Sequence, residues 1–292
     1  MKKTLKRNLI LVILLLFFLF YLGNTVFMMN EFLDYSKLFI TKLLPVSFPF
    51  FILSTLLIEY GITNLIPFAS SSFYVFFLSL ISGFPSGAKY TKDLFLKKQI
   101  NEEEANQCLK FTHFPNPLFV LGTISSTLND SLLAKKIYLA IFLSNFTLFL
   151  LSKKEKKVPL EKSNAKKDFS TALSSAITSS SKTILLIYGT SLFFYLLSIA
   201  FTKHLSFSCY LFVFVNGIFD LTKGIFSTTL LQDVTLRAYF ILLFVSLGGI
   251  SIHMQTKSIL LDTPLSYRSF FKGRIIGTIL SLIFFTLLVF LF

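Results

Sequence analysis

Charged residues are scarce in this sequence. Only 14% of its 292 residues are Asp, Glu, Lys or Arg, whereas soluble domains carry roughly 25%. Hydrophobic residues make up 54% of the chain, and its mean hydropathy is +0.73. This composition argues against a soluble enzyme and predicts a chain embedded in a membrane.

Cysteine and histidine are also rare. The two cysteines, Cys108 and Cys209, lie in different segments and give neither a disulfide framework nor a metal-ligand spacing. The three histidines form no H-x-x-x-H motif. Because no nucleotide-binding motif and no G-x-S-x-G nucleophile elbow is present, we expect no cofactor, no metal and no enzymatic chemistry.

Tryptophan is absent, so aromatic belts at the membrane interface must be built from the 11 Tyr and 38 Phe. Acidic residues are few: the chain has 28 Lys and Arg but only 14 Asp and Glu. The lysines lie mainly in short polar connections and not on a surface interleaved with aromatic residues. We therefore expect these loops to face the anionic inner leaflet of a lipid bilayer, and we expect no nucleic-acid partner.

Long apolar runs dominate what remains. We expect an all-α polytopic membrane protein with about eight transmembrane helices plus broken or re-entrant segments. The expected spans are 9–29, 38–58, 65–82, 134–151, 183–201, 207–221, 236–252 and 275–292. The first follows four basic residues and precedes no small-residue cleavage site, which predicts a retained helix with a cytoplasmic N-terminus.

Four parts follow from these runs. We expect an N-terminal helix with an outer link over 1–37, a first gate-like repeat over 38–151, a basic cytoplasmic linker over 152–182, and a second gate-like repeat over 183–292. Each half contains a span that ends in an acid and precedes a glycine-containing break. Two such halves are typical of transporters.

The first break is Ser82-Gly83-Phe84-Pro85-Ser86-Gly87-Ala88-Lys89. Opened backbone cannot face lipid, because hydrocarbon offers its polar groups no partners. Transporters place substrate sites at such breaks, with helix N-termini directed at anions. Residues 112–117, with two prolines around Asn116, predict a second break before the short apolar run 118–128, and residues 248–257 predict a counterpart of the first break in the second half.

Two topologies remain open. Eight spans place both termini and the lysine-rich linker inside, but they place the basic segments 89–110 and 257–274 outside. If the breaks at 82–89 and 248–257 are tips of re-entrant hairpins, these basic segments return inside. Hydropathy alone does not distinguish a hairpin from a span.

Three pieces together resemble a known family. They are the S-G-F-P-S-G-A-K motif at 82–89, the amphipathic stretch around 102–105, and residues 111–119 with Gly122. This pattern is similar to the sporulation integral membrane proteins of the YlbJ type, in the broader "nucleoside recognition" or gate-domain group. The resemblance runs from about Leu44 to the C-terminus, and the sequence His113-Phe114-Pro115 departs from it.

The resemblance implies a transporter for a small anionic metabolite, dipicolinic acid, in the outer forespore membrane of a sporulating bacterium, with other sporulation membrane proteins as partners. Hydroxyl, amide and lysine donors at the breaks suit a planar dianion. The expected substrate-binding residues are Ser82, Gly83, Pro85, Ser86, Gly87, Lys89, His113, Asn116, Gly249, Ser251, His253 and Gln255. Glu59 and Asp220 are expected to couple an ion or proton.

Each assignment has a structural alternative. Lys89 at the interface is an anchor that extends to water. Glu59 and Asp220 lie near span ends, where solvated caps are common, and both His113 and His253 are explained as packed helix histidines. Glycines at the breaks also permit close helix packing. For the whole chain, the alternatives are a non-transporting scaffold of the spore envelope, a nucleoside or other metabolite transporter, and an intramembrane enzyme.

Overall fold

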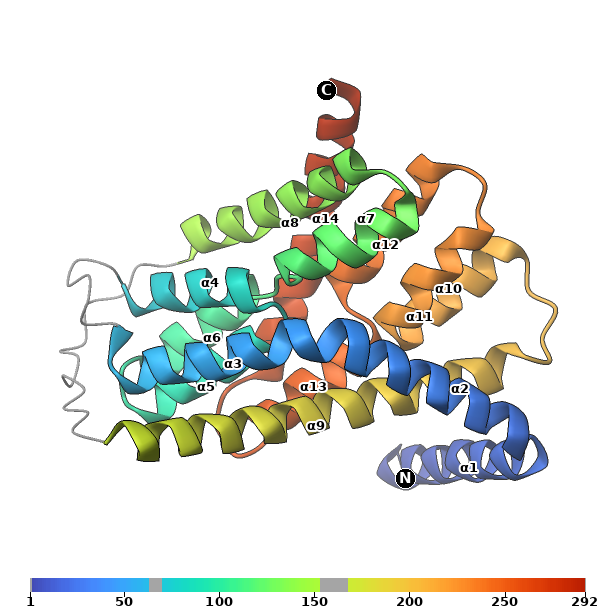
Figure 1. Cartoon of the computed structure of the whole chain (residues 1–292), viewed down its shortest axis with the longest axis horizontal. Helices are drawn as coiled ribbons and strands as arrows, with labels where there is room; N and C mark the ends of the chain where they lie inside the picture. The colour runs from blue at the N-terminus through green and yellow to red at the C-terminus, as the bar shows by residue number, and fades with distance from the viewer. Residues whose placement is uncertain (1, 63–69, 153–167, 292) are drawn as a thin grey trace.

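The computed structural model describes residues 2–62, 70–152 and 168–291, and these residues form helices joined by turns, with no strand among them (Figure 1). Six helical segments in this part of the chain are long and apolar enough to cross a membrane. They are Thr4–Gly23, Thr25–Glu59, Ser131–Leu151, Phe169–Thr202, Val234–Leu260 and Tyr267–Leu291. The expected all-α polytopic membrane fold is confirmed.

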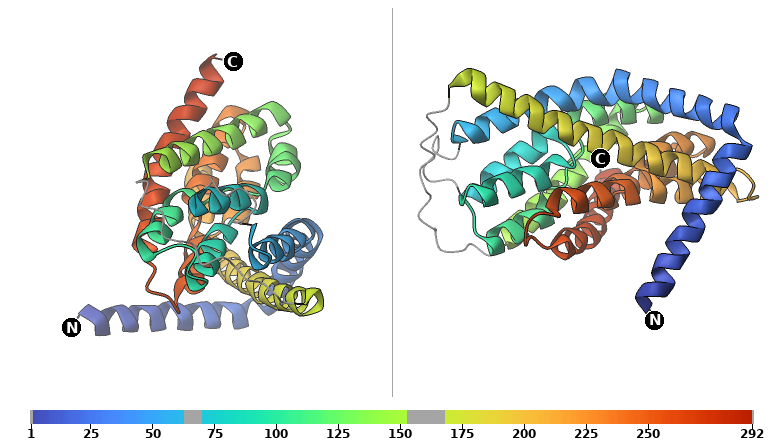
Figure 2. Two further views of the ribbon diagram at one scale, coloured as in Figure 1. Left: turned by 90° about the vertical axis from the view of Figure 1, so that its left-hand side faces the viewer. Right: turned by 90° about the horizontal axis from the view of Figure 1, so that it is seen from below.

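Two long helices frame the molecule. The first consists of α2 (Thr25–Leu38), a π-helical turn over Phe39–Leu43, and α3 (Leu44–Glu59). The second is α9 (Phe169–Thr202), which packs against α3. The preceding helix α1 (Lys2–Gly23) extends away from the bundle and contacts it mainly through aromatic side chains on α9 (Figure 2).

Two short hairpins replace two of the expected spans. Helices α4 (Ser71–Ser82) and α5 (Ser86–Leu96) pack against each other and are joined by a tight tip, as are α10 (Cys209–Phe219) and α11 (Leu221–Ser227). At 1.5 Å per residue, the 12 residues of α4 extend about 18 Å, which is short of a bilayer core of about 30 Å. The segments expected to span at 65–82 and 207–221 are therefore first arms of hairpins; residues 65–69 lie outside the described part.

Two further segments are broken helices, of which the second, Val234–Leu260, is among the six candidate spans. Helix α6 (Glu102–Phe111) continues, after an interruption at 112–116, into a π-helical turn (Phe119–Ile124) and α7 (Ser125–Leu128). Helix α12 (Val234–Leu247) continues after Gly248 and Gly249 into α13 (Ile250–Leu260). Helices α8 (Ser131–Leu151) and α14 (Tyr267–Leu291) follow the two broken helices and pack against each other.

The order of long helix, hairpin, broken helix and closing helix occurs twice along the chain. In this order the tip at Gly83–Pro85 corresponds to the tip at Asp220, and the interruption at 112–116 corresponds to Gly248-Gly249. The structure therefore differs from the expectation that residues 82–89 and 248–257 are counterparts. The α4–α5 and α10–α11 hairpins extend from opposite ends of the molecule, and their tips point toward its middle (Figure 1).

The basic segments gather at one end. Lys97 after α5 forms an ion pair with Glu59 of α3 (3.2 Å), and Lys92 of α5 lies 3.9 Å from Asp262 after α13. We call this the α3–α5 end, and we call the end where α9 finishes and α10 begins the α9–α10 end. The first break is thus a hairpin tip, and its basic second arm returns to the end from which α4 started. The lysines of the linker between 153 and 167 lie outside the described residues.

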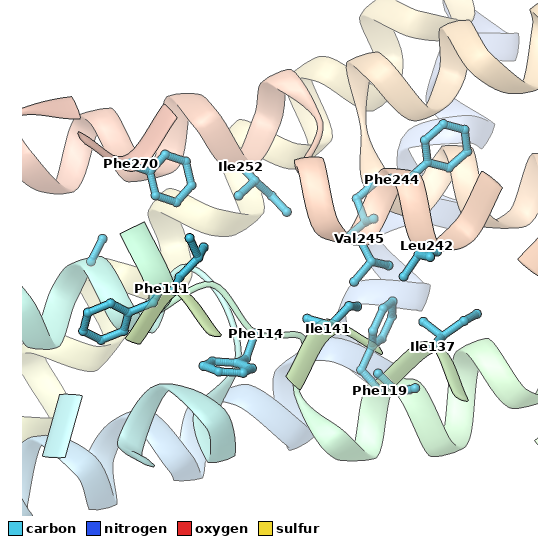
Figure 3. Close-up of a cluster of buried hydrophobic side chains, with 14 of the residues drawn as sticks. Phe111, Phe114, Phe119, Ile137, Ile141, Leu242, Phe244, Val245, Ile252 and Phe270 are labelled. Carbon is cyan, nitrogen blue, oxygen red and sulfur yellow. The ribbon is translucent and has the colours of Figure 1, made fainter. Parts of the chain in front are cut away.

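A hydrophobic core supports the breaks from behind. It is formed mainly by α6, α8, α12 and α14 (Figure 3). Its members include Phe111, Phe114, Phe119, Ile137, Ile141, Leu242, Phe244, Val245, Ile252 and Phe270. Because these apolar residues flank both interruptions, the opened backbone lies inside protein and not against lipid.

Candidate functional site

A cavity lies where the two hairpin tips and the two broken helices meet the long helices. Its volume is about 70 Å³, several times the roughly 10–15 Å³ that one water molecule requires. Its described lining comes from α2–α3, both hairpins, α9 and the two broken helices. The polar or charged lining residues are Lys42, Ser47, Ser82, Asn116, Ser191, Asp220, Thr222, Ser251 and Gln255.

The first hairpin contributes Ser82 and Phe84 to this cavity. Gly83 has a φ of +77°, a left-handed conformation that favours glycine, and the Phe84–Pro85 peptide bond is cis. The tip is held by its neighbour: the Phe84 backbone N–H donates to Phe114 O (2.7 Å). A Cβ on Gly83 would lie 2.6 Å from the backbone nitrogen of Asn116, so the tip and the interrupted helix touch directly.

Asn116 joins that tip to the helical turn that begins at Pro117 and leads into the π-helical turn Phe119–Ile124. Its amide nitrogen donates to the carbonyl of Ile81 (3.2 Å), and its side-chain oxygen accepts from the backbone N–H of Leu118 (2.8 Å). The side chain therefore satisfies the last carbonyls of one broken segment and the first amide groups of the next. This is how opened backbone is accommodated at depth.

Asp220 forms the second tip, and only 1% of it is exposed. One carboxylate oxygen accepts from the backbone N–H groups of Thr222 (2.9 Å) and Lys223 (3.1 Å) and so caps α11. The other oxygen accepts from the hydroxyl of Ser251 at 3.0 Å. Among the described residues that line the cavity, Asp220 is the one buried charged group.

Helix α13 provides the remaining polar wall. Ser251 and Gln255 lie one turn apart, and the Gln255 amide donates to Ser191 of α9 (2.9 Å). The start of α13 fits closely on the second tip, because a Cβ on Gly249 would lie 3.1 Å from Gly217 O. Hydroxyl and amide groups from three separate elements thus converge around Asp220.

Of the residues expected from the sequence, Ser82, Asn116, Ser251 and Gln255 line the cavity together with Asp220. Gly83, Pro85 and Gly249 shape the tips beside it. Ser86 turns its hydroxyl back onto Gly83 O, and Gly87 packs against Thr112. These two positions shape the first tip without lining the cavity.

Lys89 lies away from the cavity. It is 4% exposed, and its ammonium group donates to Thr55 (2.9 Å) and to the Asp93 carboxylate (2.9 Å). Glu59 is further out, in its ion pair with Lys97. Asp220, but not Glu59, therefore lies beside the other polar groups of the site.

Both histidines support the break behind the cavity. Nε2 of His113 lies 3.0 Å from Val245 O, and its ring stacks on Phe84. Nε2 of His253 lies 3.0 Å from Leu247 O, and its Nδ1 lies 2.8 Å from the Tyr267 hydroxyl. Each histidine is thus hydrogen-bonded to a carbonyl at the end of α12.

Two important residues, Arg274 and Asn145, are not among those expected at the site. Arg274 of α14 is 1% exposed and donates to Lys110 O (2.8 Å), to Ser246 O (3.3 Å) and to the side-chain oxygen of Asn145 (3.2 Å). Asn145 in turn donates to His113 O (2.8 Å). A single buried cation therefore contacts the C-terminal ends of both α6 and α12, where helix dipoles favour positive charge.

Among the described residues, no group of three or more His, Cys, Asp and Glu side chains is arranged to hold a metal ion. The polar atoms at the cavity are hydroxyl, amide and backbone N–H groups around one buried carboxylate, with the exposed Lys42 as the cation of the described lining. Such an arrangement can bind a small polar solute by hydrogen bonds, and it can hold a proton or a cation at Asp220.

The chain is similar to the sporulation integral membrane protein YlbJ of Bacillus subtilis (strain 168), with 28% identity over an alignment of 302 positions that covers 84% of this chain and 73% of that protein. No protein-family model and no solved structure matches the chain. The similarity confirms the family resemblance given by the motif at 82–89 and supports a YlbJ-type assignment.

Proposed function

We propose that this YlbJ-type integral membrane protein is a permease that moves a small anionic metabolite through the central cavity. One observation carries the proposal: a cavity with polar groups in its wall lies between hairpin tips that extend from opposite ends of the molecule. Broken helices that meet around a central site are the arrangement by which transporters expose one site to two sides in turn. In this proposal each half of the chain acts as one gate-like repeat.

Dipicolinate is the proposed solute, and the outer forespore membrane is the proposed location. The relative's name places it in sporulation, and the cavity is lined by hydroxyl and amide groups whose present partners a bound carboxylate would replace. These are the hydroxyls of Ser82, Ser191 and Ser251 with the amides of Asn116 and Gln255. The N-terminal turn of α13, with Ser251 and Ile252, also borders the cavity and favours negative charge.

Asp220 gives this proposal a second part. An anion beside a buried carboxylate would be repelled unless the carboxylate were neutralised. We therefore propose that Asp220 binds a proton or a monovalent cation when the anion binds, so that the two move together. Neutralising Asp220 removes the repulsion and leaves its capping oxygens available to α11.

A second candidate has its own observation. Because the one buried charged residue in the described lining is acidic, the cavity also suits a neutral polar solute such as a nucleoside. A nucleoside would use the same hydroxyl and amide groups without requiring neutralisation of Asp220. A non-transporting scaffold would need no solute site at all.

Transport by the purified protein in liposomes tests these alternatives. We expect labelled dipicolinate to accumulate, and we expect Ser191→Ala and Ser251→Ala each to lower the initial rate on the order of tenfold, since each removes a hydroxyl from the site. The matched control is Ser175→Ala, an exposed serine on the same helix as Ser191. Asp220→Asn should abolish accumulation driven by an ion gradient while exchange of internal for external dipicolinate continues.

Uptake of a nucleoside without dipicolinate would favour the second candidate. If neither compound is taken up by protein that is folded and inserted, the permease proposal fails and the scaffold remains. Dipicolinate uptake that is equal in Ser191→Ala, Ser251→Ala and Ser175→Ala would place the solute outside this cavity.

A further inference from the structure

Two series of polar side-chain contacts extend from the cavity, one toward each end of the molecule. We call the first seam the polar contacts between α3 and α5, made by Ser54, Thr55, Lys89, Tyr90 and Asp93. We call the second seam the polar contacts of Glu31 on α2, Tyr195 on α9 and Lys223 on α11. In an apolar helical protein, such groups are costly to bury and therefore require an explanation.

The first seam begins at the cavity wall. The Ser82 hydroxyl, which lines the cavity, lies 2.9 Å from the hydroxyl of Ser54 and accepts from Tyr90 (2.8 Å). One residue further along α3, Thr55 accepts from Lys89, which also pairs with Asp93 (2.9 Å). The seam connects the cavity to a buried ammonium group by successive contacts.

Exposure increases outward along this seam. Ser82 is 1% exposed and Lys89 is 4% exposed, whereas the side chains of Asp93 and Lys97 are 26% and 29% exposed. Lys97, with its partner Glu59, marks the α3–α5 end. The contacts of Lys89 therefore lie between the buried cavity and water.

The second seam begins at Asp220 and runs toward the opposite end. Asp220 accepts from the backbone N–H of Lys223, whose ammonium group lies 3.8 Å from the Glu31 carboxylate. The same Glu31 oxygen accepts from the hydroxyl of Tyr195 (2.9 Å), and the Lys223 ammonium lies 4.8 Å from the Tyr195 ring centre. Their side chains are 22% exposed for Lys223 and 23% for Glu31.

The two seams have the same arrangement of lysine, carboxylate and long helix. Each hairpin carries a lysine near the start of its returning arm, and each lysine connects that arm to the first long helix: Lys89 to Thr55 on α3, Lys223 to Glu31 on α2. Each lysine also has a carboxylate partner. Helices that only needed to pack closely would do so with small residues at less cost in desolvation.

We propose that these two lysine bridges are the gates of the cavity. The bridge of Lys89 to Thr55 and Asp93 closes it toward the α3–α5 end, and the bridge of Lys223 to Glu31 closes it toward the α9–α10 end. The structure holds both bridges formed, so both gates are closed in it. This inference rests on the proposed solute site, and breaking one bridge lets the adjoining hairpin arm separate from the long helix.

Sided cysteine labelling tests the gates. Cys108 and Cys209 are replaced by Ala, and Ser191→Cys is introduced as a reporter inside the cavity. A membrane-impermeant methanethiosulfonate is then added to one face of sealed vesicles of known orientation, and the labelling rate is measured. Surface reporters at Lys98→Cys and Leu205→Cys identify the face to which each end of the molecule is exposed.

We expect slow labelling of the reporter from both faces when both bridges are intact. Lys89→Ala and Thr55→Ala should each raise the rate on the order of tenfold from the α3–α5 face alone. Lys223→Ala and Glu31→Ala should do so from the α9–α10 face alone. Thr55→Ala removes only a hydroxyl and keeps the test valid if Lys89→Ala fails to fold.

Matched controls remove a lysine outside each bridge. Lys92 lies on the same helix as Lys89, and Lys92→Ala breaks its ion pair with Asp262. Lys37→Ala removes an exposed lysine from α2, the helix of Glu31. Both should label like the parent. The proposal is overturned if bridge variants label no faster than these controls, or if either set of variants opens the cavity to both faces.

The two proposals fail separately, because labelling needs no solute. Sided labelling without dipicolinate or nucleoside uptake would reject the solute assignment and leave the gates standing. Uptake through the cavity with unsided labelling would reject the gates alone.

Discussion

A buried guanidinium, that of Arg274, binds carbonyl oxygens at the C-terminal ends of two helices, α6 and α12. Arg274 donates to carbonyls of both α6 and α12, and among the described residues it makes no ion pair with a carboxylate. Its charge is compensated by carbonyl oxygens at two helix C-termini, where the backbone dipoles favour a cation. Without this side chain, Lys110 O, Ser246 O and the Asn145 amide oxygen would lose their shared donor.

We expect Arg274→Met to lower the free energy of unfolding by about 3 kcal/mol, because buried carbonyls that lose a donor cost about 1–3 kcal/mol each. Arg274→Lys should recover part of the loss, since an ammonium retains the charge but not the planar spread of donors. Thermal unfolding in detergent measures both variants. Arg268→Met, at an exposed position of the same helix, is the control and should unfold like the parent.

At the scale of elements, close backbone contact between α14 and α6 allows Arg274 to reach Lys110. A Cβ on Gly273 would lie 2.4 Å from the Lys110 carbonyl oxygen, so the two helices touch through backbone at this point. Gly277, one turn later, would meet only ordinary contacts at 3.5 Å or more. Small residues at such crossings are typical of helix packing in membranes.

Gly273→Ala should therefore push α14 away from α6 and reduce stability by about 1–3 kcal/mol, the usual range for overpacking. Gly277→Ala on the same face should be tolerated and serves as the matched control. Thermal unfolding of the two variants in detergent gives the comparison. Equal melting temperatures for both would show that α14 and α6 approach each other less closely than described.

At the scale of the whole molecule, each hairpin returns to the end from which it started. Ion pairs place the ends of α3, α5 and α13 together, as Lys97–Glu59 and Lys92–Asp262 show. Asn24 and Lys203 meet at the opposite end, with 2.7 Å between Asn24 Oδ1 and Lys203 Nζ. Lys92 and Lys97 therefore lie at the same end as the start of α9 (Figure 1).

This arrangement predicts the sidedness of surface reporters. In the cysteine-free background, Lys98→Cys, Asp262→Cys and Ser170→Cys should label from one face, and Leu205→Cys and Thr229→Cys from the other. The eight-span alternative places position 98 opposite position 170, so labelling of these two from different faces would exclude the hairpin. Impermeant thiol reagents on oriented vesicles give the answer without any transport assay.

Sequence patterns located the breaks but not their partners. The motif at 82–89 and the polar residues near 116 and 251 led to four residues that line the cavity. Lys89 was an expected ligand because its charge follows an opened helix, yet its partners are Thr55 and Asp93. Thr55 lies 34 positions away in the sequence, and contacts at that separation depend on how α3 meets α5.

The sequence by itself determined that the chain is an all-helical membrane protein interrupted by polar breaks. The length of an apolar run and the positions of proline and glycine are enough for this, because they affect the backbone of their own segment. Only the tertiary structure decided whether an apolar segment crosses or turns back, since hydropathy records how apolar a segment is and not its direction. The tertiary structure also decided that His113, His253 and Arg274 bind carbonyls behind the cavity while Asp220 lies in its wall. Those placements depend on which buried polar group finds a partner, and such partners come from helices far apart in the chain.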